Sequence, residues 1–523
     1  MWEAEEREEP EKPEKPEKPE KPEKPENNFV SPVLLTPAPP APPLAVPLPL
    51  SLYPAQPYLI VSRSETSIMT PSPTLQMHNW EGSLISHPKA VVKPQTVEEI
   101  VEIIKDRDRY PSPVRAVGSN HSTTRCAVAD GGTVIDMTNM NKILHIGSDR
   151  VTTQGGALYI DVAHELRKHG LQFFVNVELG DLTLGSAACG GTKDASMPDE
   201  FGQVCSYAVG MKMVTPAGEL VEITEDQPEL LQIARSSYGL MGIVYEVTFR
   251  VKPHQMMAVR HGTYRLDEFE KALPTLTQQN ESMMLYLFPF LDRVAVEYRR
   301  YHNVQGKPNR LLWRFRNTTW KSIAPGLGYI VTRFIPIKGL RYFVVDTFNR
   351  IMLAILRFVL KDRCTSPTDQ IIRYPDESNW TRYTFSIWAF PEESYAAKLR
   401  AYFEFCRAYY REHGYRCDLL NVGYRISRDT SSLLSYSFDT GVLTLDPVST
   451  GGPAWEKFLV AYNEFCSENG GIPLFNQTKS ITPAQARKAF GGRLDKLEQY
   501  RSQYDPADRL LNQYFREMLN TME

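Results

Sequence analysis

The stretch 115–123, with the sequence Arg-Ala-Val-Gly-Ser-Asn-His-Ser-Thr, constrains this chain most, because it places glycine, small hydroxyls and one histidine on a tight turn. A helix and a short apolar strand are expected directly before it. Successive backbone N–H groups in such a turn form a concave nest that binds an anion such as a pyrophosphate. His121 would then place its imidazole beside a bound ring. The stretch therefore predicts an anion-binding loop.

A second run of small residues, Gly180–Lys193, follows later in the chain. It resembles a phosphate-binding P-loop, but Gly191 stands where that motif has its lysine. No Gly-x-Gly-x-x-Gly motif follows a strand, so the nicotinamide fingerprint is missing. Two interpretations stay open: a backbone path that a flat ligand approaches closely, or a packed loop between a strand and a helix.

Composition narrows the class of protein. Hydrophobic residues make up 42% and charged residues 23% of the 523 residues, enough for a sizeable core. A net charge of −3 gives no general attraction to nucleic acid, and no nucleic-acid partner is predicted. The seven cysteines contain no Cys-x-x-Cys pair, which favours a reducing compartment. His164 and His169 lie about 140° apart around a helix, so no metal site is predicted.

Residues 1–75 are rich in proline. A Glu-Lys-Pro repeat runs from Pro10 to Pro25, and an apolar proline-rich segment follows at 31–57. This predicts a disordered leader, with a docking strip for a proline-binding domain as the alternative. Neither a signal peptide nor an unbroken apolar run long enough to span a membrane is recognised. We expect a cytoplasmic protein, or one peripheral on an intracellular membrane.

Residues 76–253 alternate short strands and helices, which predicts an α+β fold with short connections. Thr96 and Glu99 suggest a capping box that opens a helix, with Val97, Ile100, Val101 and Ile104 on one face. The expected strands lie at 114–117, 133–136, 151–154, 209–215, 219–223 and 242–251, and a further helix at 160–169 ends at Gly170.

Residues 254–490 predict a second domain built on a sheet. Apolar strands at 283–288 and 294–298 precede long helices at 395–413 and 455–469. Residues 491–523 are expected to form a helical segment that packs back on the first domain.

An insert at 309–363 combines many arginines and lysines with aromatic residues such as Trp313, Trp320, Phe334 and Phe343. Such a mixture on amphipathic segments suits a membrane surface, and peripheral membrane contact is one interpretation. The other is an ordinary pair of core helices with solvated arginines. Single-stranded nucleic acid also binds such mixtures, but the total charge disfavours it.

Six motifs in order resemble the flavin-binding domain of the vanillyl-alcohol-oxidase superfamily, and its sugar-lactone and alditol oxidase branch most. They cover residues 77–253 well, the C-terminal part moderately and residues 300–370 hardly at all. The motifs are Asn79–Gly82, Val117–Ser122, Val134–Asp136 with Met140 and Asn141, Leu182–Ser186, Gly239–Val244, and Asp505-Pro506 with Leu511–Tyr514.

This resemblance implies a two-subdomain, PCMH-type FAD-binding domain and an α+β cap over the isoalloxazine. His121 matches the position where many members attach the flavin 8α-methyl group, so covalent FAD is expected, with a histidine that only lines the pocket as the alternative. The residues implied to bind FAD are Val117, Gly118, Ser119, Asn120, His121, Ser122, Thr183, Gly185, Ser186, Gly190, Gly191 and Ile243.

The cap departs from the family pattern. Relatives carry Glu-x-Arg on a substrate-facing strand, where this chain has Gly423 and Arg425. A later family histidine has become Leu474 or Asn476, and the family lysine survives as Lys479. The resemblance implies catalytic roles for Arg425, which would orient a substrate oxygen, and for Lys479, which would stabilise charge on the reduced ring. Losing a carboxylate and an imidazole favours a less polar alcohol over a lactone or alditol.

The predicted function is that of an FAD-dependent oxidoreductase. It would oxidise a CH–OH group of a small-molecule alcohol or sugar-derived substrate by hydride transfer to flavin, and oxygen or another acceptor would reoxidise the cofactor. Two alternatives stay open: a membrane-associated flavoprotein acting on a lipid-linked sugar or sterol, and a flavin-binding scaffold without turnover.

Overall fold

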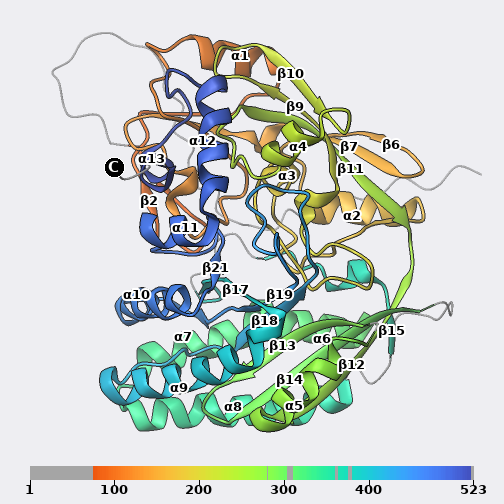
Figure 1. Cartoon of the computed structure of the whole chain (residues 1–523), viewed down its shortest axis with the longest axis vertical. Helices are drawn as coiled ribbons and strands as arrows, with labels where there is room; N and C mark the ends of the chain where they lie inside the picture. Colours follow the sequence, from red (N-terminus) through yellow and green to blue (C-terminus); the bar gives the residue numbers. More distant parts are fainter. Residues whose placement is uncertain (1–74, 280, 303–309, 360–362, 375–379, 520–523) are drawn as a thin grey trace, which may run out of the picture. The chain divides into compact units, whose positions relative to one another are not determined.

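The computed structural model describes residues 75–279, 281–302, 310–359, 363–374 and 380–519. The leader predicted at 1–75 lies outside these residues, except for Leu75. The predicted α+β class is confirmed, since helices and antiparallel sheets alternate along the described chain (Figure 1).

A small parallel sheet and its helix come first. The helix α1 (Val97–Lys105) buries Ile100 and Ile104 against this sheet. Thr96 accepts the N–H of Glu99, as predicted, but the Glu99 carboxylate accepts from Gln95 instead of closing the box on Thr96. The strands lie in the order β3 (Ala90–Val92), β5 (Thr133–Asp136) and β4 (Val114–Val117), and the hairpin β1 (Met77–His78) and β2 (Ile85–Ser86) precedes them.

A six-stranded antiparallel sheet forms the second layer. The strands predicted at 209–215 and 219–223 pair in it as a hairpin, and the predicted helix that ends at Gly170 is present. Its order is β10 (Leu220–Thr224), β9 (Ala208–Val214), β11 (Ile243–Pro253), β7 (Arg150–Gln154) and β6 (Ile143–Ile146), with β8 (Leu171–Phe173) also paired to β11. Its helices are α2 (Tyr159–Lys168), α3 (Leu184–Cys189) and α4 (Pro228–Ala234).

An eight-stranded antiparallel sheet dominates the second half of the described chain. Successive side chains of a strand point to opposite faces of the sheet. Leu285 accordingly packs in one hydrophobic cluster, while Met284 and Tyr286 pack in another on the opposite face. The order is β15 (Arg363–Thr365), β12 (Met256–Arg265), β14 (Arg293–His302), β13 (Ser282–Phe288), β18 (Asn421–Ile426), β19 (Val442–Leu445), β17 (Trp388–Pro391) and β21 (Ile472–Pro473). A further small pair joins β16 (Thr384–Phe385) and β20 (Val448–Ser449).

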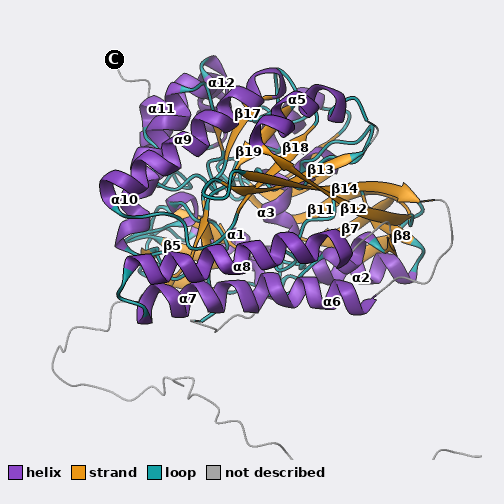
Figure 2. Cartoon of the chain, turned by 90° about the horizontal axis from the view of Figure 1, so that it is seen from below, coloured by secondary structure: helices purple, strands orange, loops and turns teal. Residues whose placement is uncertain are grey.

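Two helical layers sandwich this sheet. The predicted helices at 395–413 and 455–469 are confirmed as α9 (Tyr395–His413) and α10 (Pro453–Glu468), which pack with α5 (Leu266–Leu276) on one face. The insert covers the other face with α6 (Arg310–Thr318), a π-helical turn (Thr319–Ile323), α7 (Ala324–Phe334) and α8 (Lys338–Val359). Figure 2 shows α6 and α7 end to end in one row along the lower edge of the fold, with α8 running beside them. No described helix has the length and hydropathy that crossing a membrane requires.

The C-terminal helices α11 (Pro483–Phe490), α12 (Gly492–Tyr504) and α13 (Gln513–Leu519) share a buried cluster with strands of the six-stranded sheet. Arg115, at the second residue of β4, is buried and joins three distant segments. Its guanidinium donates to the carbonyls of Cys126 (3.1 Å), Leu510 (3.0 Å) and Tyr238 (2.6 Å). This arginine fixes the predicted anion-binding turn to the end of the described fold.

Candidate active site

A cavity of about 270 Å³ lies between the part of the fold formed by residues 76–253 and the eight-stranded sheet. Both predicted flavin loops line it, and so do residues of the cap and of the insert. Ten of the twelve predicted FAD-binding residues are among its lining: Val117, Gly118, Ser119, Asn120, His121, Ser122, Thr183, Gly185, Ser186 and Gly190. The structure therefore brings the two loops to one wall, which we call the flavin wall.

The two loops touch where they cross. A Cβ on Gly118 would lie 2.1 Å from Oγ1 of Thr183, and a Cβ on Gly185 would lie 2.9 Å from the carbonyl oxygen of Gly155. No side chain larger than hydrogen fits at position 118 without displacing the second loop. Gly118 and Gly185 therefore let the loops pack closely at these two points.

The flavin wall fits the FAD implied by the resemblance. Within the described chain, the backbone N–H groups of residues 119–122 donate to no acceptor, which leaves a row of donors for a pyrophosphate. Two cavity-lining amide oxygens, Oδ1 of Asn476 and Oε1 of Gln477, are buried without a described partner and can accept from a bound ring. Val117–Ser122 and Thr183–Ser186 would hold the pyrophosphate.

His121 lies in an aromatic setting. Its ring centroid is 5.0 Å from that of Trp80, which in turn contacts Tyr374 (5.8 Å) and Tyr383 (5.7 Å). Burial lowers the pKa of His121 to about 4, so the imidazole is neutral and keeps its lone pair at neutral pH. A neutral imidazole is the nucleophilic form that a covalent bond to a flavin methyl carbon requires.

Opposite the flavin wall lies a buried ion pair. Lys193 Nζ is 3.0 Å from Oδ2 of Asp446 and 3.6 Å from the ring centroid of Tyr424. All three side chains line the cavity. Burial lowers the pKa of Lys193, against the opposing effect of Asp446, and burial raises the pKa of Asp446. Oδ1 of Asp446 is buried with no described hydrogen-bond partner, so it can accept a proton or a hydrogen bond from a ligand.

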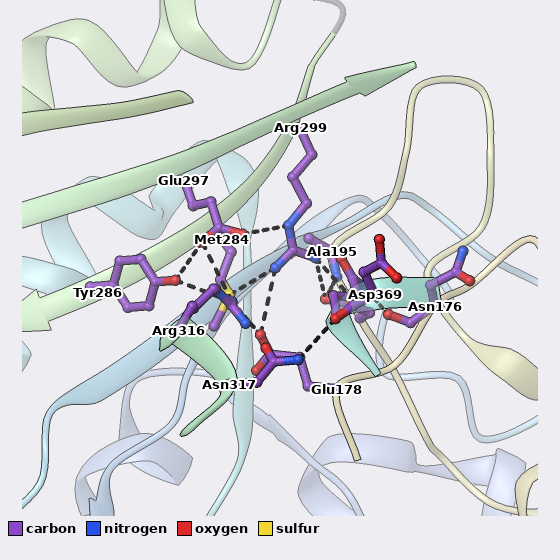
Figure 3. Close-up of polar contacts among 12 residues, drawn as sticks. Asn176, Glu178, Ala195, Met284, Tyr286, Glu297, Arg299, Arg316, Asn317 and Asp369 are labelled. Atoms are coloured by element: carbon purple, nitrogen blue, oxygen red, sulfur yellow. Dashed lines mark hydrogen bonds and ion pairs between the residues drawn. The ribbon is translucent and has the colours of Figure 1, made fainter. Parts of the chain in front are cut away.

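A network of buried charges lies beside the cavity (Figure 3). Asp194 binds Arg299 at 3.0 Å, and Arg299 Nε donates to Glu297 at 2.7 Å. Arg316, from helix α6 of the insert, donates to Glu178 and lies 3.5 Å from Glu297. Glu178 and Asp194 also line the cavity. The insert is thus anchored by buried charges to both the part of the fold formed by residues 76–253 and the cap sheet.

The roof of the cavity is apolar and comes from the insert. The residues of the insert that line the cavity are Trp320, Ala324, Pro325, Leu327, Gly328, Val345, Phe348 and Asn349. Met284 and Val422 of the cap sheet continue this surface. Within its described residues, the insert forms three helices and a π-helical turn rather than a helix pair, and its Arg316 is buried rather than solvated.

Two predicted FAD-binding residues stand just behind the wall. Ile243 is fully buried at the start of β11, while its neighbours Gly242 and Val244 line the cavity. Gly191 is not a lining residue either. A Cβ there would lie 3.4 Å from Leu474 and 3.6 Å from Asn476.

The two residues predicted to be catalytic, Arg425 and Lys479, are not among those that line the cavity. Arg425 points to the opposite face of β18 from Tyr424 and pairs with Glu392 at 2.9 Å. Lys479 binds Glu456 at 2.7 Å and Ser83 at 2.8 Å. Their catalytic roles stay predictions, without a direct contact to the cavity.

The structure places the residues at which the resemblance implies a departure from the family pattern. A Cβ on Gly423 would lie 2.5 Å from the carbonyl oxygen of Thr444, on the face of β18 away from Tyr424. Asn476 lines the cavity and Leu474 is buried in an apolar cluster, so Asn476 occupies the ligand-facing place.

The chain resembles known proteins over most of its length. Residues 88–224 match the family described as FAD binding domain, and residues 247–518 match the family described as D-arabinono-1,4-lactone oxidase. An L-gulono-1,4-lactone dehydrogenase of Mycobacterium tuberculosis is 24% identical over 456 residues, covering 84% of this chain and 98% of that protein. An L-gulonolactone oxidase of Scyliorhinus torazame is 24% identical over 455 residues, covering 84% and 97%.

Among solved structures, cholesterol oxidase from B. sterolicum superimposes with a TM-score of 0.67 over 88% of this chain and 100% of that chain. The sequences are 14% identical, so this likeness shows the fold alone. The family match confirms the predicted FAD cofactor, and the structural likeness confirms the predicted fold.

Proposed function

This chain belongs to the D-arabinono-1,4-lactone oxidase family and is an FAD-dependent oxidoreductase, and we propose that it oxidises a CH–OH group held between the flavin wall and the Lys193–Asp446 pair. The observation that carries the proposal is that both flavin loops, Lys193 and Asp446 line one cavity. The rest of the chemistry follows from what these side chains offer.

Asp446 is the proposed proton acceptor. Its Oδ1 is buried and unpartnered, and burial raises its pKa, which makes the carboxylate a stronger base. A substrate hydroxyl that donates to Oδ1 would pass its proton there as the carbon loses a hydride. Bound FAD would supply the two-electron acceptor for that hydride, and oxygen or another acceptor would then reoxidise it.

Lys193 is the proposed positioning group. Its ammonium binds Asp446 and lies over the Tyr424 ring, so its direction is fixed on two sides. A remaining N–H can donate to a ring or carbonyl oxygen of the substrate. It also stabilises the carboxylate that must stay ionised before proton transfer.

The apolar roof supports a substrate with a hydrophobic body. Leu327, Val345 and Phe348 offer no hydrogen bonds to a polyol, and Trp320 offers only its indole N–H. A secondary alcohol or lactone with an apolar substituent fits this lining better than a small alditol does.

Anaerobic titration tests the proposal. Sugar lactones, small alditols and apolar secondary alcohols are added in turn to the purified holoenzyme while the flavin absorbance is followed. We expect a compound with an apolar body to bleach the flavin fastest. If none of these CH–OH compounds reduces the flavin, the proposed activity is wrong and a scaffold without turnover is favoured instead.

A further inference from the structure

The outer side of the insert carries a concentrated apolar surface. Of the sixteen large hydrophobic side chains that are exposed among the described residues, nine lie between positions 311 and 351. The four most exposed of these nine side chains are Leu311 (76%), Ile337 (66%), Phe334 (64%) and Phe343 (63%). Exposed hydrophobic residues scattered singly are ordinary, but a cluster of this density marks an interaction site.

The cluster follows the helical period. On α8, Leu340, Phe343 and Ile351 are exposed, while Tyr342 and Val345 are buried. On α6, Leu311 and Phe315 are exposed, while Trp313 and Arg316 are buried. The exposed and the buried side chains thus lie on different faces of α6 and of α8, and the exposed face of each is apolar.

Positive charge accompanies the apolar face. Residues 310–359 contain nine arginines and lysines but one acidic residue, Asp346. Asp346 is already paired with Arg416 at 2.6 Å, and Arg316 belongs to the buried network. Among the described residues, no carboxylate pairs with Arg314, Arg333, Lys338 or Arg350. The whole chain has a net charge of −3, so the insert is strongly basic against an acidic remainder.

We infer that α6, α7 and α8 form a docking surface for an anionic phospholipid bilayer. Exposed Phe, Leu and Ile side chains would enter the interface between headgroups and acyl chains, and the unpaired arginines and lysines would bind lipid phosphates. Helix α8 runs beside the row that α6 and α7 form end to end at one edge of the fold, so a flat surface can meet all three (Figure 2). A second copy of this chain is disfavoured as the occupant, because two such basic faces repel each other.

The docking surface adjoins the cavity. Helices α7 and α8 also provide Leu327, Val345 and Phe348 to the roof described above. One thin helical layer therefore separates a lipid surface from the substrate chamber. This placement would let an apolar substrate pass from the bilayer into the chamber, although docking itself does not depend on which substrate is used.

Vesicle co-sedimentation of the full-length holoenzyme tests the inference. Two vesicle preparations are used, phosphatidylcholine alone and phosphatidylcholine with about one-third phosphatidylserine. We expect binding to the anionic vesicles that weakens at high salt, and much weaker binding to the neutral ones. Native protein that stays in the supernatant with anionic vesicles overturns the inference.

Paired variants distinguish lipid docking from non-specific adhesion. The pair Phe334→Ser and Phe343→Ser, and separately Lys338→Glu with Arg350→Glu, should each lower the partition coefficient at least about tenfold. A matched control, Leu220→Ser with Val460→Ser, removes two side chains exposed to 58% and 62% elsewhere on the fold and should change nothing. Flavin content and turnover of a water-soluble substrate should stay at the native level in all three.

Two results would contradict the inference. The control pair could reduce binding as much as the insert pairs do, which would indicate non-specific adhesion. Alternatively, gel filtration could show a dimer that the Phe334 and Phe343 substitutions dissociate, which would identify a second copy as the occupant.

Discussion

The two walls of the cavity are built in different ways. The flavin wall comes from two loops within residues 117–190, and its shape depends on glycine backbone and free N–H groups. The opposite wall and the roof combine side chains from the insert, β13, β18 and the residue after β19. The backbone shapes the flavin wall, and side chains give the opposite wall its chemistry. A substitution that disables one wall should therefore leave the other wall intact.

This difference separates what is shared with relatives from what is particular to this chain. A dinucleotide presents the same pyrophosphate to every member of the family, so a wall of main-chain donors suits all of them. Substrates differ, and the wall that meets them carries Lys193, Asp446 and an apolar roof. Substitutions that disturb one wall therefore test whether the other responds.

Gly118→Ala should have the largest effect. The added methyl group would lie 2.1 Å from Thr183 Oγ1, which forces the two flavin loops apart. We expect almost complete loss of flavin, read as the ratio of flavin to protein absorbance. Gly339→Ala is the matched control, since a Cβ there has nothing within 4 Å. Full flavin content in the Gly118 variant would show that the loops can move freely.

Asp446→Asn should lower kcat by about 10²–10⁴-fold while the flavin content stays native. The native enzyme should lose activity as the pH falls through the pKa of Asp446, which burial raises above the usual aspartate range. This acid limb should disappear from the pH profile of the variant. A native rate and an unchanged profile would remove Asp446 from the reaction.

Arg316→Met should lower the free energy of unfolding by about 3–5 kcal/mol, because it removes the closest cation from Glu178 and one of the two arginines that pair with Glu297. Arg314→Met, on the exposed side of the same helix, should stay within about 0.5 kcal/mol of the native value. Urea titration measures both. Equal stability of the two variants would show that the insert is not anchored through this network.

The same network predicts a pH dependence. Burial alone would raise the pKa of Glu297, but Arg316 and Arg299 outweigh it and hold that pKa well below its usual range. Stability from Glu297 is therefore present above the ordinary carboxyl pKa and is lost as the pH falls. This acid sensitivity should be smaller in Arg316→Met.

His121→Ala tests the bond to the cofactor within the flavin wall. The imidazole is neutral above about pH 4, so it can react at neutral pH. We expect flavin to stay with the native polypeptide after acid precipitation and to leave the variant, which should still bind flavin when folded. Retention by the precipitated variant would exclude a bond through His121.

Arg425→Met should have the smallest effect, a change in kcat/KM within about twofold, because its half-exposed pair with Glu392 lies outside the cavity lining. A large loss of rate would restore the substrate-orienting role that the family resemblance implies for this residue.

The flavin wall was largely predictable from the sequence, because it is built from short continuous segments of the chain. The strand at 114–117, the turn after it and the second glycine run are continuous stretches whose backbone conformations are set by their own residues. Ten predicted binding residues accordingly meet in one place.

The opposite wall was not predictable in the same way. Glu178 and Arg316 are 138 positions apart, and no local pattern indicates that they pair. Because successive side chains of a strand point to opposite faces, Tyr424 and Arg425 must lie on different faces of β18. The sequence does not indicate which of these two faces lines the cavity. Lys193 carried a signal, a lysine at the end of a glycine run, yet its partner Asp446 lies 253 positions away.

Arg115 carries a consequence for biosynthesis. Its three carbonyl partners belong to residues 126, 238 and 510, so the turn that cradles the cofactor depends on a segment made hundreds of residues later. Chains emerge from the ribosome N-terminus first, and early segments can fold before late ones exist. The loops at 117–190 nevertheless stay incomplete until residue 510 has docked. Cofactor loading is consequently a late event, and nascent chains arrested before that point should be colourless.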